Sequence, residues 1–416
     1  MRACFGVLSL LVVLGTAAHA AAQDAGTLTL RDALREARRG NPELVALQRQ
    51  YDSARAAVPE ARFLEPPTFE TQIWGWPVTT FNPARTDMYM FTGEQTLPGR
   101  GKRAARELVA TRDAGISQQQ IAVRANGLLN EVKQTYAELL LARATADLYR
   151  QQTPLVDDMA EAATLRYAAG HSGQHDTVKS IVELSRLHAD AIEWRERARV
   201  AETRLNVLLG RAPDAHVPEL APMESPVPAL ADAEGIALDR NPELAMASAE
   251  LAREEAELAR LQGERHPDFV IGGGYMLQPG GAGAWTARAG ITWPNAPWSR
   301  GRLNTSIDAQ EKRVIAVRAR REAAAAQVRR AVHEAYAQVE AARDRLQLLE
   351  SAVVPHIEHA FDVARASYAS DRAEFGDLLD TERVLLSTRM EVVSVRAGLA
   401  KAVGDLEMAL GDVPEN

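Results

Sequence analysis

Few side chains in this sequence have a type and spacing that could bind a ligand, and the clearest are two histidines. His171 and His175 stand four residues apart, so they share one face wherever the segment is helical, which is a ligand spacing for a soft divalent metal. The surrounding Gly170 and Gly173 also fit a turn whose histidines simply face water. Both interpretations stay open; the two histidines are weak metal candidates, and the sequence predicts no resident metal.

A second ligand pattern is formed by Met88 and Met90, because alternate residues of a strand share one face. Paired thioethers are ligands for Cu(I), although methionine more commonly fills gaps. Three further histidines fall in helical segments without forming a ligand cluster: His333, His356 and His359. The sequence contains no Ser-His-Asp triad, phosphate loop or paired-carboxylate cleft, so it predicts neither an enzyme nor a cofactor.

Composition indicates long helices and excludes one class of partner. Hydrophobic residues make up 46% of the chain and charged residues 25%, but aromatic residues only 5%. Many alanines with Glu and Arg are typical of long packed helices. The net charge of −8 and the absence of a basic patch with interleaved aromatics argue against nucleic acid as a partner.

The N-terminus has the pattern of an export signal, which we assign to residues 1–20. Arg2 is followed by an apolar stretch and by the small-residue cleavage pattern Ala18-His19-Ala20. The apolar stretch is too short to span a bilayer, which needs about 18 residues or more. The single cysteine, Cys4, lies inside the signal, so the mature chain is expected to have no disulfide and no thiolate site.

The chain repeats itself at an offset of 241 − 41 = 200 residues. Asn41-Pro42-Glu43-Leu44 returns as Asn241-Pro242-Glu243-Leu244, and Tyr136 returns as Tyr336. We therefore expect one structural unit used twice, in the order helix, strand, strand, long helix, shorter helix. The expected organisation is a first repeat at 21–212, a Pro-rich connector at 213–228, a second repeat at 229–411 and a C-terminal tail at 412–416.

Each repeat contains two stretches with the alternation of strands, at about 67–77 and 86–97 and at about 267–278 and 284–294. Phe269, Ile271 and Tyr275 fall on one face, and Thr286, Arg288 and Thr292 on the other. A soluble sheet with one face on a core would alternate in the same way. Aromatic residues near the strand ends favour a membrane. They are Trp74, Trp76, Trp285, Trp293 and Trp298.

Four strands do not close a membrane barrel, because unpaired strand edges are not tolerated in lipid. If these strands face lipid, several chains must share one barrel, and three chains would supply twelve strands; the count alone does not exclude two chains. Two long helical stretches, at about 101–169 and 302–370, would each extend roughly 100 Å. Pro154 and Pro355 should kink them, and shorter helices from Asp176 to Leu209 and from Asp377 to Leu410 should fold back on them.

These features together resemble the TolC-like outer-membrane efflux proteins of Gram-negative bacteria, over essentially the whole mature chain. The resemblance rests on the duplicated unit, on both Asn-Pro-Glu-Leu segments and on Leu97-Pro98-Gly99-Arg100-Gly101-Lys102-Arg103 after the second strand. It implies a mainly α fold with a small β part: a trimer with a 12-stranded β-barrel in the outer membrane, joined to a long α-helical barrel in the periplasm. The basic Pro-Gly turn looks most like the heavy-metal efflux branch.

The resemblance also implies a function and its partners. Members of this family are passive exit ducts of tripartite pumps, and they dock through their helical tips to a periplasmic adaptor that joins an inner-membrane pump. Others serve type I protein secretion, which remains an alternative, as does a periplasmic coiled-coil structural or adaptor protein. Export of metal, drug or protein is not distinguished by the sequence.

By the same resemblance, side chains at the two helical hairpin turns form the periplasmic gate. The implied gate residues are Asp176, Tyr368, Asp371, Arg372, Asp377 and Asp380, and the implied adaptor-docking residues are Gly170, His171 and Ser172. Three-fold symmetry would turn each carboxylate into a ring of three that attracts cations. The alternative for Asp176 and Asp377 is that they cap the returning helices, and both roles are compatible.

Overall fold

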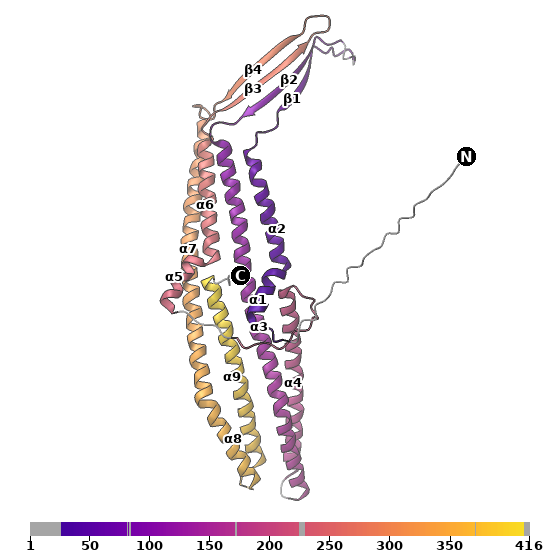
Figure 1. Ribbon diagram of the computed structural model, residues 1–416, viewed down its shortest axis with the longest axis vertical. Helices are drawn as coiled ribbons and strands as arrows, with labels where there is room; N and C mark the ends of the chain where they lie inside the picture. The colour runs from indigo at the N-terminus through magenta and orange to yellow at the C-terminus, as the bar shows by residue number, and fades with distance from the viewer. Residues whose placement is uncertain are drawn as a thin grey trace, which may run out of the picture.

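The computed structural model describes residues 26–80, 82, 85–170, 173–223, 229–370 and 372–411. Over these residues the protein is an elongated bundle of helices with a small β-sheet at one end (Figure 1). The predicted signal at 1–20, the tail at 412–416, part of the connector, His171, Ser172 and Asp371 lie outside the described residues.

The elements follow the same order twice. The first series is α1 (Leu30–Gly40), α2 (Pro42–Ala57), the 3₁₀-helix η1 (Val58–Arg62), β1 (Thr68–Trp74), β2 (Met88–Leu97), α3 (Lys102–Ala168) and α4 (Gln174–Leu209). The second is α5 (Leu230–Arg240), α6 (Pro242–Gly263), β3 (Asp268–Leu277), β4 (Ala284–Thr292), α7 (Arg300–Leu348), the π-helix η3 (Leu349–Val353), α8 (Val354–Ala369) and α9 (Phe375–Leu410).

The two Asn-Pro motifs make equivalent hydrogen bonds. The Asn41 side chain caps α2 by accepting from the backbone N–H of Glu43 at 3.0 Å, and its amide donates to the carbonyl of Leu208 at 3.2 Å. Asn241 caps α6 in the same way and donates to the carbonyl of Ala409 at 2.9 Å. Each motif therefore starts a helix and also ties it to the end of the returning helix, α4 or α9.

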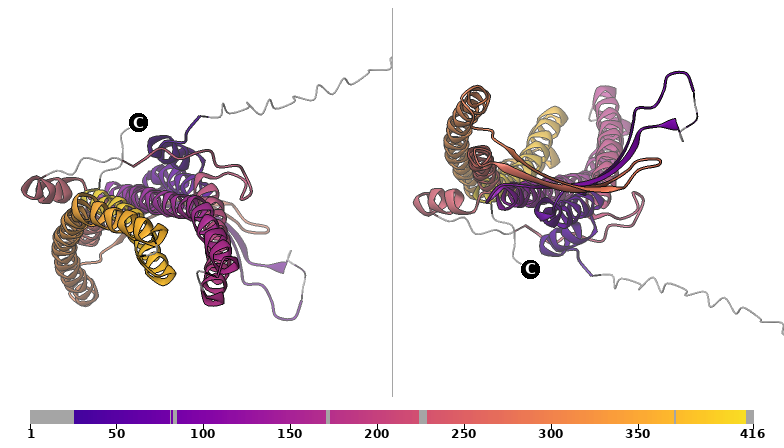
Figure 2. Two further views of the ribbon diagram at one scale, coloured as in Figure 1. Left: turned by 90° about the horizontal axis from the view of Figure 1, so that it is seen from below. Right: turned by 90° about the horizontal axis from the view of Figure 1, so that it is seen from above.

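The long helices form one curved layer (Figure 2). α3 packs against α4 on one side and α9 on the other, and α9 packs against α7. Buried apolar residues line these contacts, around Leu128 and Leu205 between α3 and α4 and around Val332 and Leu406 between α7 and α9. Among the described residues, every helix is too short or too polar to serve as a membrane-crossing helix.

Both prolines lie within continuous helical segments, but the backbone before them differs. Pro154 lies inside α3, which continues to Ala168 without ending. Pro355 stands in the first turn of α8, directly after the π-helical turn η3. Because proline lacks an N–H and clashes with the preceding turn, the second chain segment adjusts by widening its hydrogen-bond pattern before the ring. The predicted helix at 302–370 is therefore divided into α7, η3 and α8.

The sheet is antiparallel with the strand order β1-β2-β3-β4 over the described residues. Thr68 pairs with Glu94, Glu94 with Gly272, and Gly272 with Arg288, so even-numbered residues of all strands share one face. That face is polar, whereas the odd-numbered face carries Phe69, Phe91, Phe269, Ile271 and Ile291 exposed. This separation agrees with the predicted faces, and it leaves β1 and β4 at the edges with no second strand among the described residues.

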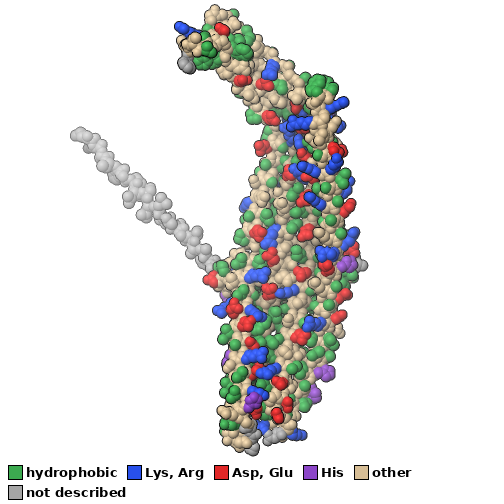
Figure 3. Space-filling model, turned by 180° about the vertical axis from the view of Figure 1, so that it is seen from behind, with side chains coloured by type: hydrophobic (Ala, Val, Ile, Leu, Met, Phe, Trp, Pro, Cys, Tyr) green, Lys and Arg blue, Asp and Glu red, His purple; other side chains and the backbone are tan. Residues whose placement is uncertain are grey.

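Aromatic side chains lie near both ends of the sheet. Trp285, the second residue of β4, packs against Tyr275 with ring centroids 5.0 Å apart. At the opposite end, next to the helices, Trp293 packs against Trp298 at 6.2 Å. All three tryptophans are more than half exposed, as residues of a membrane–water interface would be. On the face shown in Figure 3, by contrast, Lys, Arg, Asp and Glu side chains are spread along the helical body.

Candidate functional site

The hairpin tips at the far end of the helical body hold the predicted gate residues. α3 ends near Gly170, which has a left-handed φ of 76°, and α4 begins after the N-cap Gly173. Asp176 is therefore in the first turn of α4 rather than at its cap. Asp377 has the same place in α9, whose N-cap is Glu374. The capping role suggested for Asp176 and Asp377 is wrong, although the helix dipole stabilises a carboxylate in that first turn.

Tyr368 connects the two tips within one chain. The Arg166 guanidinium at the end of α3 lies 4.6 Å from the Tyr368 ring centroid, and its Nη1 donates to the Tyr368 carbonyl oxygen at 2.8 Å. The ring also packs edge-on against Phe375 at 5.7 Å. Burial raises the pKa of the Tyr368 hydroxyl, and the nearby Arg166 partly offsets this. Arg166 is the partner that the sequence did not identify.

The other tip residues face water or their own helix. Asp377 is exposed, and Asp380 pairs with Arg383 at 3.3 Å while its side chain remains 76% exposed. Arg372 donates from Nε to the Ser370 hydroxyl at 3.0 Å. Both carboxylates are exposed, although Asp380 is paired with Arg383, and within one chain neither is hydrogen bonded to Tyr368 among the described contacts.

A buried polar layer lies further from the tip, between α3, α4 and α9. Gln152 of α3 donates from Nε2 to Glu382 Oε1 of α9 at 2.5 Å, and Glu382 is fully buried. Beside them, Arg383 donates from Nε to Glu183 Oε2 of α4 at 3.1 Å. The signal in the sequence was a Glu at an apolar position of the pattern Leu378, Leu379, Leu385, Leu386, which the sequence analysis did not use.

The polar face of the sheet forms a shallow groove of about 500 Å³ lined by Glu70, Gln72, Met90 and Thr92, among others. Arg288 donates to Glu94 across it at 2.9 Å. Met88 shares this face, and Met276 stands directly opposite Met90 in the register, a neighbour that the pattern of a single strand does not reveal.

The sheet joins the helices through a buried ammonium group. Lys102, 1% exposed, lies 2.8 Å from Asp268 Oδ1 and 3.0 Å from Glu264 Oε2. The backbone N–H of Gly99 donates to the same Asp268 oxygen at 2.7 Å. The basic turn after β2 is thus a structural clamp between the first turn of α3 and the start of β3.

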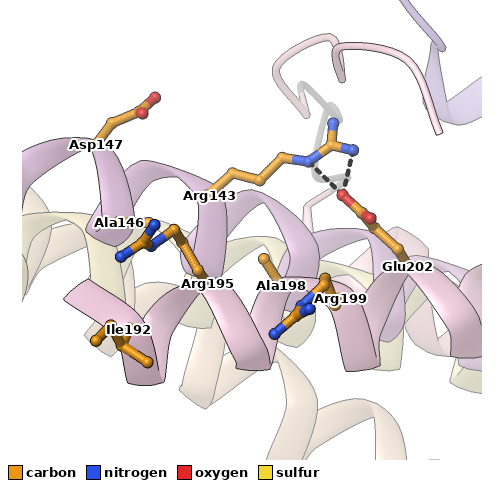
Figure 4. Close-up of a pocket in the computed structure, with 8 residues that line it drawn as sticks. All are labelled: Arg143, Ala146, Asp147, Ile192, Arg195, Ala198, Arg199 and Glu202. Atoms are coloured by element: carbon orange, nitrogen blue, oxygen red, sulfur yellow. Dashed lines mark hydrogen bonds and ion pairs between the residues drawn. The ribbon is translucent and has the colours of Figure 1, made fainter. Parts of the chain in front are cut away.

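An arginine-rich groove runs between α3 and α4 (Figure 4). Arg143 points toward Glu202, to which its Nε donates at 3.1 Å, and it also donates to the carbonyls of Val217 and Pro218 at 2.7 and 2.6 Å. Arg143 therefore holds the connector against the helices. These bonds make Arg143 a structural contact, and Arg195 and Arg199 line the same groove.

The structure leaves the histidine pair untested as a metal site. Groups of three or more His, Asp or Glu side chains arranged to hold a metal are absent from the part of the chain that the structure describes. His175 is exposed in the first turn of α4, while its predicted companion His171 is outside the described residues.

The similarity to known proteins covers both repeats of the fold. Residues 33–211 and 235–412 each match the family described as Outer membrane efflux protein. The cobalt-zinc-cadmium resistance protein CzcC of Cupriavidus metallidurans is 25% identical over 395 residues, covering 93% of this chain and 91% of that protein.

Solved structures with the same fold include two channels. CusC superposes with a TM-score of 0.78 at 17% identity, over 92% of this chain and 91% of that one. VceC from Vibrio cholerae superposes with a TM-score of 0.76, also at 17% identity, over 92% of this chain and 96% of that one.

Proposed function

This chain belongs to the outer membrane efflux protein family, and on that basis we propose that three copies form one channel that is the exit duct of a tripartite pump. As in its relatives, the protein is an outer-membrane efflux channel that extends into the periplasm, and it is a passive conduit rather than an enzyme. The proposal adds the trimer, the shared barrel and the docking of the tips to an adaptor.

The sheet carries the proposal of a shared barrel. One face is polar, the other exposes phenylalanine and isoleucine, and β1 and β4 have no second strand among the described residues. In hydrocarbon an unpaired edge leaves backbone groups without hydrogen bonds at a cost of several kcal/mol each, so the edges must pair with other copies. Three sheets would give 3 × 4 = 12 strands, with the polar faces lining the lumen.

The mass of the purified protein in detergent tests this assembly. We expect three times the mass of the mature chain and a band on semi-native gels that heat converts to monomer. A mass equal to two mature chains would show that the channel is a dimer and not a trimer. A stable monomer that needs no detergent would contradict the barrel altogether.

We further propose that the cargo is a heavy-metal cation. The support is the relative named for cobalt, zinc and cadmium resistance, which aligns over 93% of this chain. Deleting the gene should lower the host's tolerance to these cations, and the full chain should restore it. Unchanged metal tolerance with lowered tolerance to organic drugs would point to the other cargo class.

The tips complete the proposal. We assign the gate to Asp176, Tyr368, Asp371, Arg372, Asp377 and Asp380, and the adaptor contact to Gly170, His171 and Ser172. Support comes from Arg166, which joins the end of α3 to Tyr368 of the second hairpin. Cysteine pairs between Gly170 of this chain and adaptor tip positions should cross-link in cells if the tips dock; cross-links confined to the helical flank would contradict tip docking.

A further inference from the structure

The fully buried carboxyl of Glu382 has no role in the gate described above. It lies on α9 in the second hairpin, formed by α8 and α9, and meets the first hairpin, formed by the end of α3 and by α4. Its Oε1 accepts from the Gln152 amide, and its Oε2 is buried with no hydrogen-bond partner among the described residues. A buried carboxylate oxygen left without a donor is costly if it is charged.

Apolar clusters on both sides isolate this group from water. Tyr149, Val156, Leu187 and Leu386 pack together in one cluster, in which Tyr149 and Val156 lie on either side of Gln152 along α3. On the tip side, another cluster joins α3, α8 and α9 through residues such as Met159, Phe361 and Leu379. Glu382 and Gln152 thus form a polar contact between the hairpins that survives only while the hairpins stay together.

Charged side chains near Glu382 on α4, α8 and α9 form ion pairs with one another. On α4, Glu183 pairs with Arg383 of α9, and Arg383 also pairs with Asp380. On α8, Glu358 pairs with Arg389 of α9 at 2.8 Å. α3 contributes the neutral Gln152. Burial raises the pKa of Glu382, with a further rise from Glu183, while Gln152 and Arg383 lower it in part.

We propose that Glu382 is a positioning residue of the periplasmic gate: its neutral carboxyl holds α9 against α3 and α4, and loss of its proton lets the two hairpins separate. The proposal rests on the channel function proposed above and adds a residue outside the predicted gate set. Separation exposes the carboxyl to water, where its pKa falls back to the ordinary range of a glutamic acid. The advantage of the closed state is therefore complete below that range, and it is lost as pH rises through the raised pKa of the closed state.

The decisive variant is Glu382→Gln, which keeps the shape and cannot ionise. In planar bilayers, the open probability of the parent trimer should rise roughly tenfold as pH rises from about 4.5 to about 8.5. Glu382→Gln should remain closed throughout. Glu350→Gln is the matched control, because that exposed carboxylate pairs with Arg396 inside the second repeat.

A variant in which the exposed His188, His356 and His359 are all changed to Gln should keep the parent's pH dependence. A structural readout is independent of conduction: spin labels at Val178 of α4 and Val363 of α8, both about half exposed, should move apart as pH rises in the parent only. Label distances that do not change with pH, or that change equally in Glu382→Gln, would overturn the proposal. If neither protein conducts, the channel function fails, while the label distances still decide the role of Glu382.

Discussion

The Lys102 ammonium group lies 2.8 Å from a carboxylate oxygen of Asp268, and this contact joins the first turn of α3 to the first residue of β3. The two residues are 166 positions apart and come from different repeats. Lys102 also contacts Glu264 at the end of α6, so one buried cation fixes the direction in which the sheet leaves the helical body.

Replacing Lys102 should therefore impair assembly. Lys102→Met leaves the partly buried carboxylates of Asp268 and Glu264 without a cation, and breaking such a buried pair costs about 3–5 kcal/mol. We expect a lower melting temperature of the trimer on semi-native gels and less protein in the outer membrane. The exposed neighbour Arg103→Met is the control and should behave like the parent. Equal stability of both variants would show that the clamp is dispensable.

The two faces of the sheet should respond differently to charge. Ile271 is 51% exposed on the apolar face, and a lysine at the middle of the bilayer costs about 2–4 kcal/mol there. Ile271→Lys should therefore reduce the yield of assembled trimer, whereas Thr292→Lys on the polar face should not. Equal losses from both substitutions, measured by the heat-sensitive band, would contradict the assigned lipid and lumen faces.

The contact between Arg166 and Tyr368 should hold the tip closed. Arg166→Ser removes the stacked guanidinium and its bond to the Tyr368 carbonyl, a loss of about 1–2 kcal/mol, which raises the open fraction roughly tenfold. Tyr368→Phe keeps the ring packing on Phe375 and should have a smaller effect, as should Arg372→Ser, whose side chain contacts Ser370. Single-channel recordings measure the open fraction and the conductance of these three variants. Arg150→Ser, exposed on α3, is the control; conductance raised equally there would remove the specific role of Arg166.

Asp380 should determine how strongly cations block the channel, and not whether the tip is closed. Its side chain is 76% exposed at the second tip, and three copies around one axis would concentrate negative charge at the entrance. Asp380→Ala should weaken block by multivalent cations added on the periplasmic side, with little change in conductance in their absence. Asp239 is an exposed carboxylate on α5, outside the hairpin tips, and Asp239→Ala is the control. Block that is unaffected by Asp380→Ala would place the constriction elsewhere.

Local signals in the sequence were sufficient for the elements and their order. Asn41 and Asn241 predicted the starts of two helices, because capping by Asn before Pro depends only on residues a few positions away. The structure has both caps. Alternation in the strands predicted which side chains share a face, because the period of a strand is fixed by its backbone. The matching positions of Pro154 and Pro355 did not reveal the π-helical turn before Pro355, since the response of a helix to proline depends on what packs beside it.

Contacts between distant parts of the chain were decided only by the tertiary structure. Gln152 and Glu382 are 230 residues apart, and Arg166 reaches Tyr368 across 202. Composition and periodicity show that α3 and α9 each have an apolar stripe, but many registers bury such stripes equally well. Which polar side chains meet inside the stripe depends on the axial register of the packed helices, and that register is set by the sum of contacts along their whole length. The sequence alone thus determines the repeated unit, and packing between the repeats determines which residues face one another at the tip.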